Sequence, residues 1–422
     1  MGFISKAYYF FAPYTDAHEK AVATFFKGLN EHSGQTHTRA RLGNLIQRDI
    51  AVINLWTEYR YKGYHYLRKA KRRRLYANLR LIAADFDRFY RQHVQPADTV
   101  LAHVRAIAPE ATVDPAKATL LHALMGYFSP GQGLYEYRDS SSFGRLLRDP
   151  THETLVGDCN QIVTLYIYLY SRYYDVHDLQ VRTLPGHVAL HYSGVDIEAT
   201  NSTYANYETT SGNALLPIEE IVSINLLDTT DSYLSTHEIA AEVFLQASRF
   251  AFVLSHDRQI VTQNLATAYN NLVVSLLQRN NYKRALDFAG ASGNKSLLST
   301  VGHNGALYEM DHHNYAAARR FAAVADDRDI LIRSSWRAEG AHHYQAKRYH
   351  EAIRAFDHTD DREHVQQCYE ALFFEEQAKL GTNLTTESIK QYRKTINRMR
   401  LYAKKSGNKG LIEHTNALSQ HL

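Results

Sequence analysis

The sequence contains little cysteine, methionine or tryptophan: its 422 residues include two, four and two of them. The two cysteines, Cys159 and Cys368, lie far apart, and neither belongs to a Cys-x-x-Cys pair. This argues against a disulfide framework and against a zinc knuckle. We therefore expect a protein of a reducing compartment.

Long uncharged runs are absent too, since no stretch approaches the ~18 apolar residues of a membrane span. The first twenty residues lack the basic segment and apolar core of a secretion signal, and Lys6 stands where N-myristoylation needs Ser or Thr. Neither a P-loop nor a dinucleotide fingerprint occurs, so no cofactor is expected. These absences predict a cytoplasmic protein without a membrane span.

What remains is the composition of an ordinary globular chain, 45% hydrophobic and 22% charged. A net charge of +4 on this length does not by itself imply a nucleic-acid partner. The length allows two or three domains. We expect a helical region at 1–114, a mixed core at 115–230 and helical repeats with capping helices at 240–422.

The core contains a cysteine at a predicted helix start. Asp158 is a good N-cap and Gln161 occupies the capping-box position, so Cys159 becomes the first helical residue. The backbone N–H groups and the dipole of that helix end favour a thiolate. The neighbouring charge of Asp158 opposes it, so a reactive thiol needs a further partner.

A predicted β-hairpin offers that partner. Strands are expected at 179–183, 187–192 and 195–200, with a break at 184–186 and a two-residue turn at Ser193-Gly194. This turn places Tyr192 opposite Val195. One face is then apolar throughout, and the other carries His187, His191, Asp196, Glu198 and Thr200.

The register also distinguishes the two acids. It pairs His191 with Asp196 and Ala189 with Glu198, which makes Glu198 a diagonal neighbour of His187 at about 7–8 Å. We predict that Glu198 orients His187, with Asp196 as the second choice. The alternative is a capped core helix beside a polar hairpin face, with His187 and Glu198 merely solvated.

This order of Gly-x-Cys at a helix start, Pro-Gly-His opening a strand and an acid two residues before Thr resembles the transglutaminase-like superfamily. The segment LPGHVALHY is most similar to short bacterial cores joined to tetratricopeptide-type helices. The resemblance covers about residues 115–210. It implies Cys159 as the nucleophile, His187 as the general base and Glu198 as the third residue. Glu198 replaces the usual aspartate, and Ala189 stands where many active members carry tryptophan.

The C-terminal part repeats. Tyr282, Tyr315 and Tyr349 are 33 and 34 residues apart, and each is followed three positions later by alanine. That period is typical of tetratricopeptide helix pairs, which stack into a solenoid. We expect the tyrosines to be buried at equivalent turns and to contact the following helix. We also expect Ala306 and Ala341 to lie where helices approach closely.

The predicted fold class is therefore α+β. The chain is mostly helical, with a cysteine-bearing helix packed on an antiparallel sheet of three or more strands and a C-terminal α-solenoid. Two functions fit. The first is a cysteine enzyme that hydrolyses amide or peptide bonds or transfers their acyl group, while the repeats recruit a protein or peptide. The second is an inactive scaffold for protein–protein interaction.

Four other features of the sequence favour a structural interpretation. The run at 68–74, RKAKRRR, lies among tyrosines, but helical spacing spreads its charges around the helix. A solvated helix, or one that docks on an acidic partner surface, is therefore favoured over a nucleic-acid site. His187 and His191 would lie about 13 Å apart on a strand and cannot share a metal ion. The adjacent histidines at 312–313 and 342–343 point apart on helices. Cys368 is expected to be a small core residue.

Overall fold

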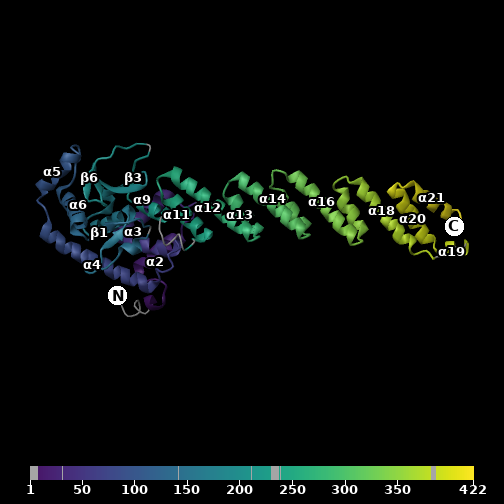
Figure 1. Ribbon diagram of the computed structural model, residues 1–422, viewed down its shortest axis with the longest axis horizontal. Coiled ribbons are helices and arrows are strands. Elements are labelled where there is room, and N and C mark those ends of the chain that lie inside the picture. The colour runs from purple at the N-terminus through teal and green to yellow at the C-terminus, as the bar shows by residue number, and fades with distance from the viewer. Residues whose placement is uncertain are drawn as a thin grey trace. The chain divides into compact units, whose positions relative to one another are not determined.

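The computed structural model describes residues 8–422 apart from positions 31, 141, 211, 230–236, 238 and 382–385. The chain forms two compact units, Met1–Asn271 and Leu272–Leu422 (Figure 1). The boundary falls inside helix α12 (Arg258–Gln278). The regions expected at 1–114 and 115–230 therefore share one unit, and the region expected to begin at 240 starts within it.

Helices make up most of the first part of this unit. They are α2 (Ala17–Lys27), α3 (Gln35–Tyr61), α4 (Lys69–His93), α5 (Ala97–Ile107) and α6 (Pro115–Phe128). The Asp16 side chain caps α2, and Asp114 caps α6 with Pro115 in its first turn. Helix α3 is kinked at Asp49. It passes through the core, where Leu42, Ile46 and Ile53 are fully buried.

A five-stranded antiparallel sheet lies beside these helices, in the order β6-β5-β4-β3-β7. Its strands are β3 (Leu179–Leu184), β4 (His187–Tyr192), β5 (Val195–Glu198), β6 (Thr203–Ala205) and β7 (Ala214–Pro217). A separate parallel pair consists of β1 (Tyr135–Tyr137) and β2 (Leu155–Gly157). The described part of the chain is thus mostly helical with one small antiparallel sheet, which confirms the α+β class.

The hairpin has the predicted register. Tyr192 pairs with Val195, His191 with Asp196 and Leu190 with Ile197. The last strand ends at Glu198 and does not reach Thr200, because the chain turns there: the Ser202 N–H donates to the Glu198 carbonyl at 2.8 Å. This turn leaves Glu198 at the end of its strand.

Helix α8 (Cys159–Ser171) follows β2 directly and packs against α3 and β4. It is buried on nearly all sides, since Ile162, Val163, Tyr166 and Leu169 are each inaccessible to solvent. The short helix α7 (Phe143–Leu146) precedes β2, and α9 (Glu220–Leu227) and α11 (Ala241–Leu254) complete the unit with the start of α12. Of the described helices, none is both long enough and apolar enough to cross a membrane.

The second unit is helical throughout its described residues. After the end of α12 come α13 (Tyr282–Ala291), α14 (Lys295–Asp311), α15 (Tyr315–Ala322), α16 (Arg328–Gln345), α17 (Tyr349–Asp357) and α18 (Arg362–Gln377). The chain ends with α19 (Thr386–Gln391), α20 (Arg393–Ser406) and α21 (Lys409–Ser419). From α13 to α18 each helix packs against the next along the chain.

The three tyrosines of the repeat each begin a short helix. The residue two positions before each one, Asn280, His313 or Lys347, has a left-handed backbone with φ of 56°, 59° and 57°. In each turn the N–H of the residue directly before the tyrosine donates to the carbonyl group five residues earlier, at 2.8–2.9 Å. These are Schellman motifs, which end a helix by satisfying its last carbonyl groups. The sequence repeat therefore corresponds to a repeated turn.

Burial of the tyrosines is uneven. Tyr315 is buried, whereas Tyr282 and Tyr349 are half-buried. The Tyr282 and Tyr315 rings contact the following long helix, through Tyr308 at 4.7 Å and His342 at 6.0 Å between centroids.

The close helix approaches occur at glycines. A Cβ atom at Gly305 would lie 2.6 Å from the Phe321 ring, and one at Gly340 would lie 2.7 Å from the Phe356 ring. Ala306 is buried as expected, but Ala341 is exposed, so that expectation was wrong. Residue 341 is turned about 100° around the helix from residue 340, and only the latter faces the partner helix.

Candidate functional site

Cys159 is the first residue of α8, as predicted, and a capping box holds that helix end. The Asp158 carboxylate accepts hydrogen bonds from the N–H groups of Asn160 at 2.9 Å and Gln161 at 3.3 Å. The Gln161 side chain accepts from the Asp158 N–H at 2.9 Å. The N–H of Cys159 has no acceptor among the described residues. A backbone donor therefore remains beside the sulfur atom.

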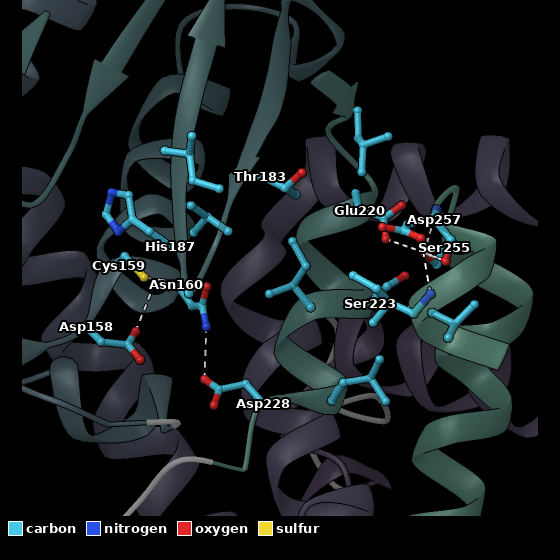
Figure 2. Close-up of a pocket in the computed structure, with 18 of the residues that line it drawn as sticks. Asp158, Cys159, Asn160, Thr183, His187, Glu220, Ser223, Asp228, Ser255 and Asp257 are labelled. Carbon is cyan, nitrogen blue, oxygen red and sulfur yellow. Dashed lines mark hydrogen bonds between the residues drawn. The ribbon is translucent and has the colours of Figure 1, made fainter. Parts of the chain in front are cut away.

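His187 opens β4, and its ring lies directly beside the Cys159 sulfur (Figure 2). Its Nε2 atom is 2.7 Å from Oε2 of Glu198. Hydrogen bonds with the Cys159 sulfur and then with Glu198 raise the pKa of His187 to about 10. The imidazole is thus held between a thiol and a carboxylate, with its charged form stabilised.

The Glu198 carboxylate is fixed from a second side. Its other oxygen accepts a hydrogen bond from the Tyr207 hydroxyl at 2.8 Å, and only 6% of the side chain is exposed. Sequence reasoning missed Tyr207, which lies nine residues further along in the connection after β6. No motif marks that position.

Asp196, the second choice for the acid, belongs to a different cluster. Its Oδ1 atom lies 2.8 Å from His191 Nδ1 and 3.1 Å from Arg182 Nε, and Oδ2 accepts from the Tyr207 N–H at 2.8 Å. Burial would raise the pKa of Asp196, but the bonds from His191, Tyr207 and Arg182 outweigh it and lower the pKa. The structure brings Asp196 to His191 and not to His187.

The Cys159 sulfur borders a cavity of about 420 Å³. The cysteine helix and the start of β4 form one wall, and α9 with the start of α12 forms the other (Figure 2). Apolar side chains such as Val188, Ile224 and Val261 share the lining with polar ones. Five carboxylates line it, and no lysine or arginine does among the described residues: Asp139, Asp158, Glu220, Asp228 and Asp257.

Two of these acids sit next to the thiol. Asp158 directly precedes Cys159, and Asp228 is connected to the thiol through Asn160. The Asn160 Oδ1 atom is 3.9 Å from the Cys159 sulfur, and its Nδ2 atom donates to Asp228 at 3.0 Å. Burial, together with the charge of Asp228, raises the pKa of Asp158 to about 7. The acid that opposes a thiolate is therefore about half neutralised near neutral pH. Sequence reasoning identified Asp158 but missed Asn160 and Asp228.

The remaining candidates lie elsewhere. Cys368 is fully buried in α18 among Phe356 and Leu372, and burial raises its pKa to about 11, as expected of a core thiol. Within the described residues, no three His, Cys, Asp or Glu side chains are grouped to hold a metal ion.

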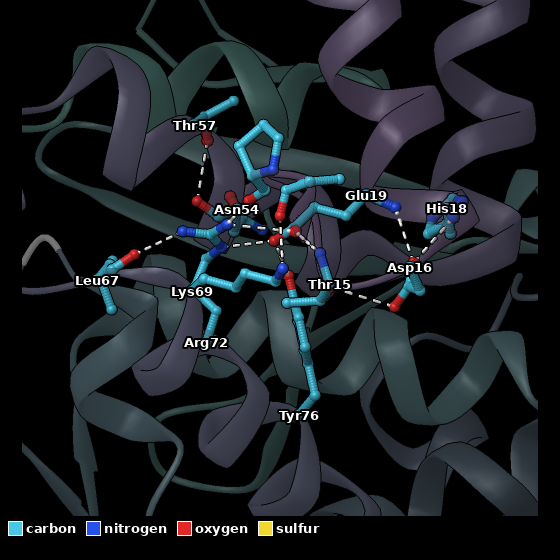
Figure 3. Close-up of polar contacts among 12 residues, drawn as sticks. Thr15, Asp16, His18, Glu19, Asn54, Thr57, Leu67, Lys69, Arg72 and Tyr76 are labelled. Carbon is cyan, nitrogen blue, oxygen red and sulfur yellow. Dashed lines mark hydrogen bonds and ion pairs between the residues drawn. The ribbon is translucent and has the colours of Figure 1, made fainter. Parts of the chain in front are cut away.

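The basic run at 68–74 contains one residue that is not on the surface. Arg72 is fully buried, and its guanidinium donates to the Leu67 carbonyl at 2.7 Å and to both carboxylate oxygens of Glu19 (Figure 3). Tyr76 donates to the same carboxylate at 3.0 Å. Arg72 therefore links α4 to α2, and because it is buried it cannot contact a partner.

The comparison with known proteins adds no relationship to this geometry. No protein-family model matches the sequence, and no curated protein matches it closely enough to suggest a common origin.

Proposed function

We propose that this protein is a cysteine-dependent enzyme acting on carboxamide or peptide bonds, with Cys159 as the nucleophile. One observation carries the proposal: His187 lies between the Cys159 sulfur and the Glu198 carboxylate, at the wall of a cavity large enough for a substrate. A base within reach of a thiol and oriented by an acid is the arrangement that activates a thiol nucleophile.

The chemistry follows from the positions of the three groups. Glu198 accepts a hydrogen bond from the Nε2–H group of His187, which leaves Nδ1 to take the proton of the thiol. The Cys159 proton passes to Nδ1, and the sulfur attacks the amide carbonyl carbon to give a tetrahedral oxyanion. The free Cys159 N–H can donate to that oxyanion. His187 then protonates the leaving amine, the C–N bond breaks, and a thioester remains.

The thioester is resolved by water or by an amine. His187 takes a proton from the incoming group, the new C–O or C–N bond forms, and the proton returns to the departing sulfur. Both outcomes use the same groups, so the site supports hydrolysis and acyl transfer alike.

The same proposal includes the relationship to transglutaminase-like proteins and the role of the second unit. The chain order of cysteine helix, histidine strand and acid strand supports the first. The three equivalent Schellman turns support the second, a tetratricopeptide-like solenoid that recruits a protein or peptide.

One observation favours the alternative, an inactive scaffold: only 6% of Cys159 is exposed. Labelling the intact protein with an α-chloroacetamide probe separates the two functions. The sulfur of a reactive cysteine displaces chloride and forms a thioether, which peptide mapping locates. We expect the adduct on Cys159 in the wild type and in Cys368→Ala, and its loss in Cys159→Ala. An unlabelled Cys159 in the folded protein would support the scaffold.

A further inference from the structure

The basic run at 68–74 divides into residues with internal partners and residues without. Arg72 is buried against Glu19, and Lys69 and Arg73 donate to backbone carbonyls of Phe10 and Tyr9 at 2.9 and 3.2 Å. Lys71 and Arg74 have neither an ion pair nor a hydrogen bond among the described residues. Both face a second cavity, of about 540 Å³.

The opposite wall of this cavity is also basic. It is formed by the segment around α7, which contributes Arg145 and Arg148. Glu58 holds this segment: its buried carboxylate accepts from the N–H of Phe143, from the N–H of Gly144 at 3.1 Å and from the Ser142 hydroxyl at 3.1 Å. On the α4 side, Asn78 donates to the Leu147 carbonyl at 3.0 Å. The two walls are therefore fixed relative to one another.

The charges of the cavity are not balanced. Lys71, Arg74 and Arg148 line it with a single carboxylate, Glu153, so these four side chains carry an excess of two positive charges. That carboxylate compensates weakly, since it is 57% exposed and lies 3.8 Å from Arg148. Burial, followed by repulsion from Arg74, lowers the pKa of Lys71. An anion entering here would relieve that repulsion.

We propose that this cavity binds a phosphorylated small molecule through Lys71, Arg74 and Arg148. The planar guanidinium groups match the geometry of phosphate oxygens, and a lysine adds a point charge beside them. Two excess positive charges suit a di- or triphosphate group better than a single carboxylate. Tyr66, Leu75 and Leu147 supply an apolar part of the lining for an attached organic group. The volume lies within the usual range for small-molecule sites.

A small ligand fits the site better than a nucleic acid does. Arg72 points inward and Lys69 and Arg73 are engaged with backbone, so the run does not form a continuous basic track along α4. A polynucleotide needs such a track to follow its backbone. This site does not depend on the proposed chemistry at Cys159.

Isothermal titration calorimetry with inorganic pyrophosphate and with ATP, at low salt, tests the proposal. We expect saturable binding by the intact protein and at least a tenfold weaker affinity for Lys71→Gln/Arg74→Gln. These side chains are not fully buried, and circular dichroism checks that the variant stays folded. The matched control is Arg80→Gln/Arg91→Gln, which removes two exposed charges from the same helix away from the cavity. It should bind like the wild type.

Three results would overturn the proposal. One is the absence of saturable binding of both probes. Another is an equal loss of affinity in the control, which would mean that only net charge matters. The third is binding of a single-stranded RNA oligonucleotide that is as sensitive to Lys71→Gln/Arg74→Gln while pyrophosphate and ATP do not bind.

Discussion

His187 and Glu198 are eleven residues apart in sequence, and their side chains meet at 2.7 Å across two strands of a hairpin. Asp196 lies nearer along the chain, yet it faces His191 at 2.8 Å. Glu198 therefore contacts His187, whereas Asp196 contacts His191. One pair borders a cavity with a cysteine, and the other is part of a buried cluster with Arg182.

Cys159 should be the faster-reacting thiol. Its sulfur lies beside the His187 ring and borders a cavity, whereas Cys368 is buried among apolar side chains. Rates of alkylation by iodoacetamide at neutral pH, measured by intact mass, should keep their fast phase in Cys368→Ala and lose it in Cys159→Ala. His187→Ala should slow this phase by about tenfold or more. A fast phase that belongs to Cys368 would contradict the assignment of Cys159 as the nucleophile.

The two hairpin acids should respond differently to neutralisation. Glu198→Gln keeps the size of the side chain but removes the charge that stabilises the His187 imidazolium, so alkylation and any amide turnover should fall. Asp196→Asn should instead destabilise the fold by about 3–5 kcal/mol, because it leaves the Arg182 charge buried without its partner. Thermal unfolding and alkylation rates of both variants measure this split. The assignment reverses if Asp196→Asn slows alkylation more than Glu198→Gln does at equal stability.

The pairing of His187 should make stability depend on pH in the alkaline range. Its pKa is about 10 in the folded protein, above the 6.5 of a free histidine. A raised pKa means that the imidazolium stabilises the fold fully below about pH 6.5. This contribution is then lost as the pH rises to about 10. The difference in unfolding temperature between wild type and His187→Ala should therefore shrink across this window.

Cys159→Ala provides the control for this pH dependence. It removes the largest contribution to the raised pKa, so the pH window should shift downward in that background. A difference between wild type and His187→Ala that stays constant from pH 6.5 to 10 would mean that the histidine is not held as an imidazolium.

Arg72 should matter to stability far more than its neighbours in the basic run. Arg72→Met leaves the Glu19 carboxylate buried and without its cation, at a cost of about 3–5 kcal/mol. Arg73→Met, at an exposed position, should change stability by less than about 0.5 kcal/mol. Urea unfolding in a Trp336→Phe background measures both, since Trp56 then reports on the first unit. Equal effects of the two substitutions would show that the buried Arg72–Glu19 pair does not contribute to the free energy of unfolding.

Two glycines distinguish close helix packing from helix propensity. Gly340→Ala places a Cβ atom 2.7 Å from the Phe356 ring, and overpacking of this kind costs about 1–3 kcal/mol. Gly290 lies in the last turn of α13, and a Cβ atom there meets nothing within 4 Å. Gly290→Ala should thus stabilise its helix, by at most about 0.5–1 kcal/mol. Thermal unfolding of the two variants should show opposite signs, and a destabilised Gly290→Ala would contradict the helix arrangement.

Local chemistry determined much of this protein from its sequence. Asp158 and Gln161 set the start of the cysteine helix, because a capping box involves only four consecutive positions. The Ser193-Gly194 turn set the register that brings Glu198 to His187, because side chains alternate strictly along a strand. The spacing of Tyr282, Tyr315 and Tyr349 indicated three equivalent turns, each of which precedes a short helix.

Only the tertiary structure decided what depends on distant partners. Arg72 differs from the other basic residues of its run because Glu19, 53 residues earlier, meets it in the core. Asp228 reaches Asn160 across 68 residues, and the cavity beside Cys159 exists only where α9 and α12 pack opposite β4. Gly340, and not Ala341, receives Phe356 because helix rotation chooses between adjacent positions. Such choices depend on how separate elements pack together, which no local pattern specifies.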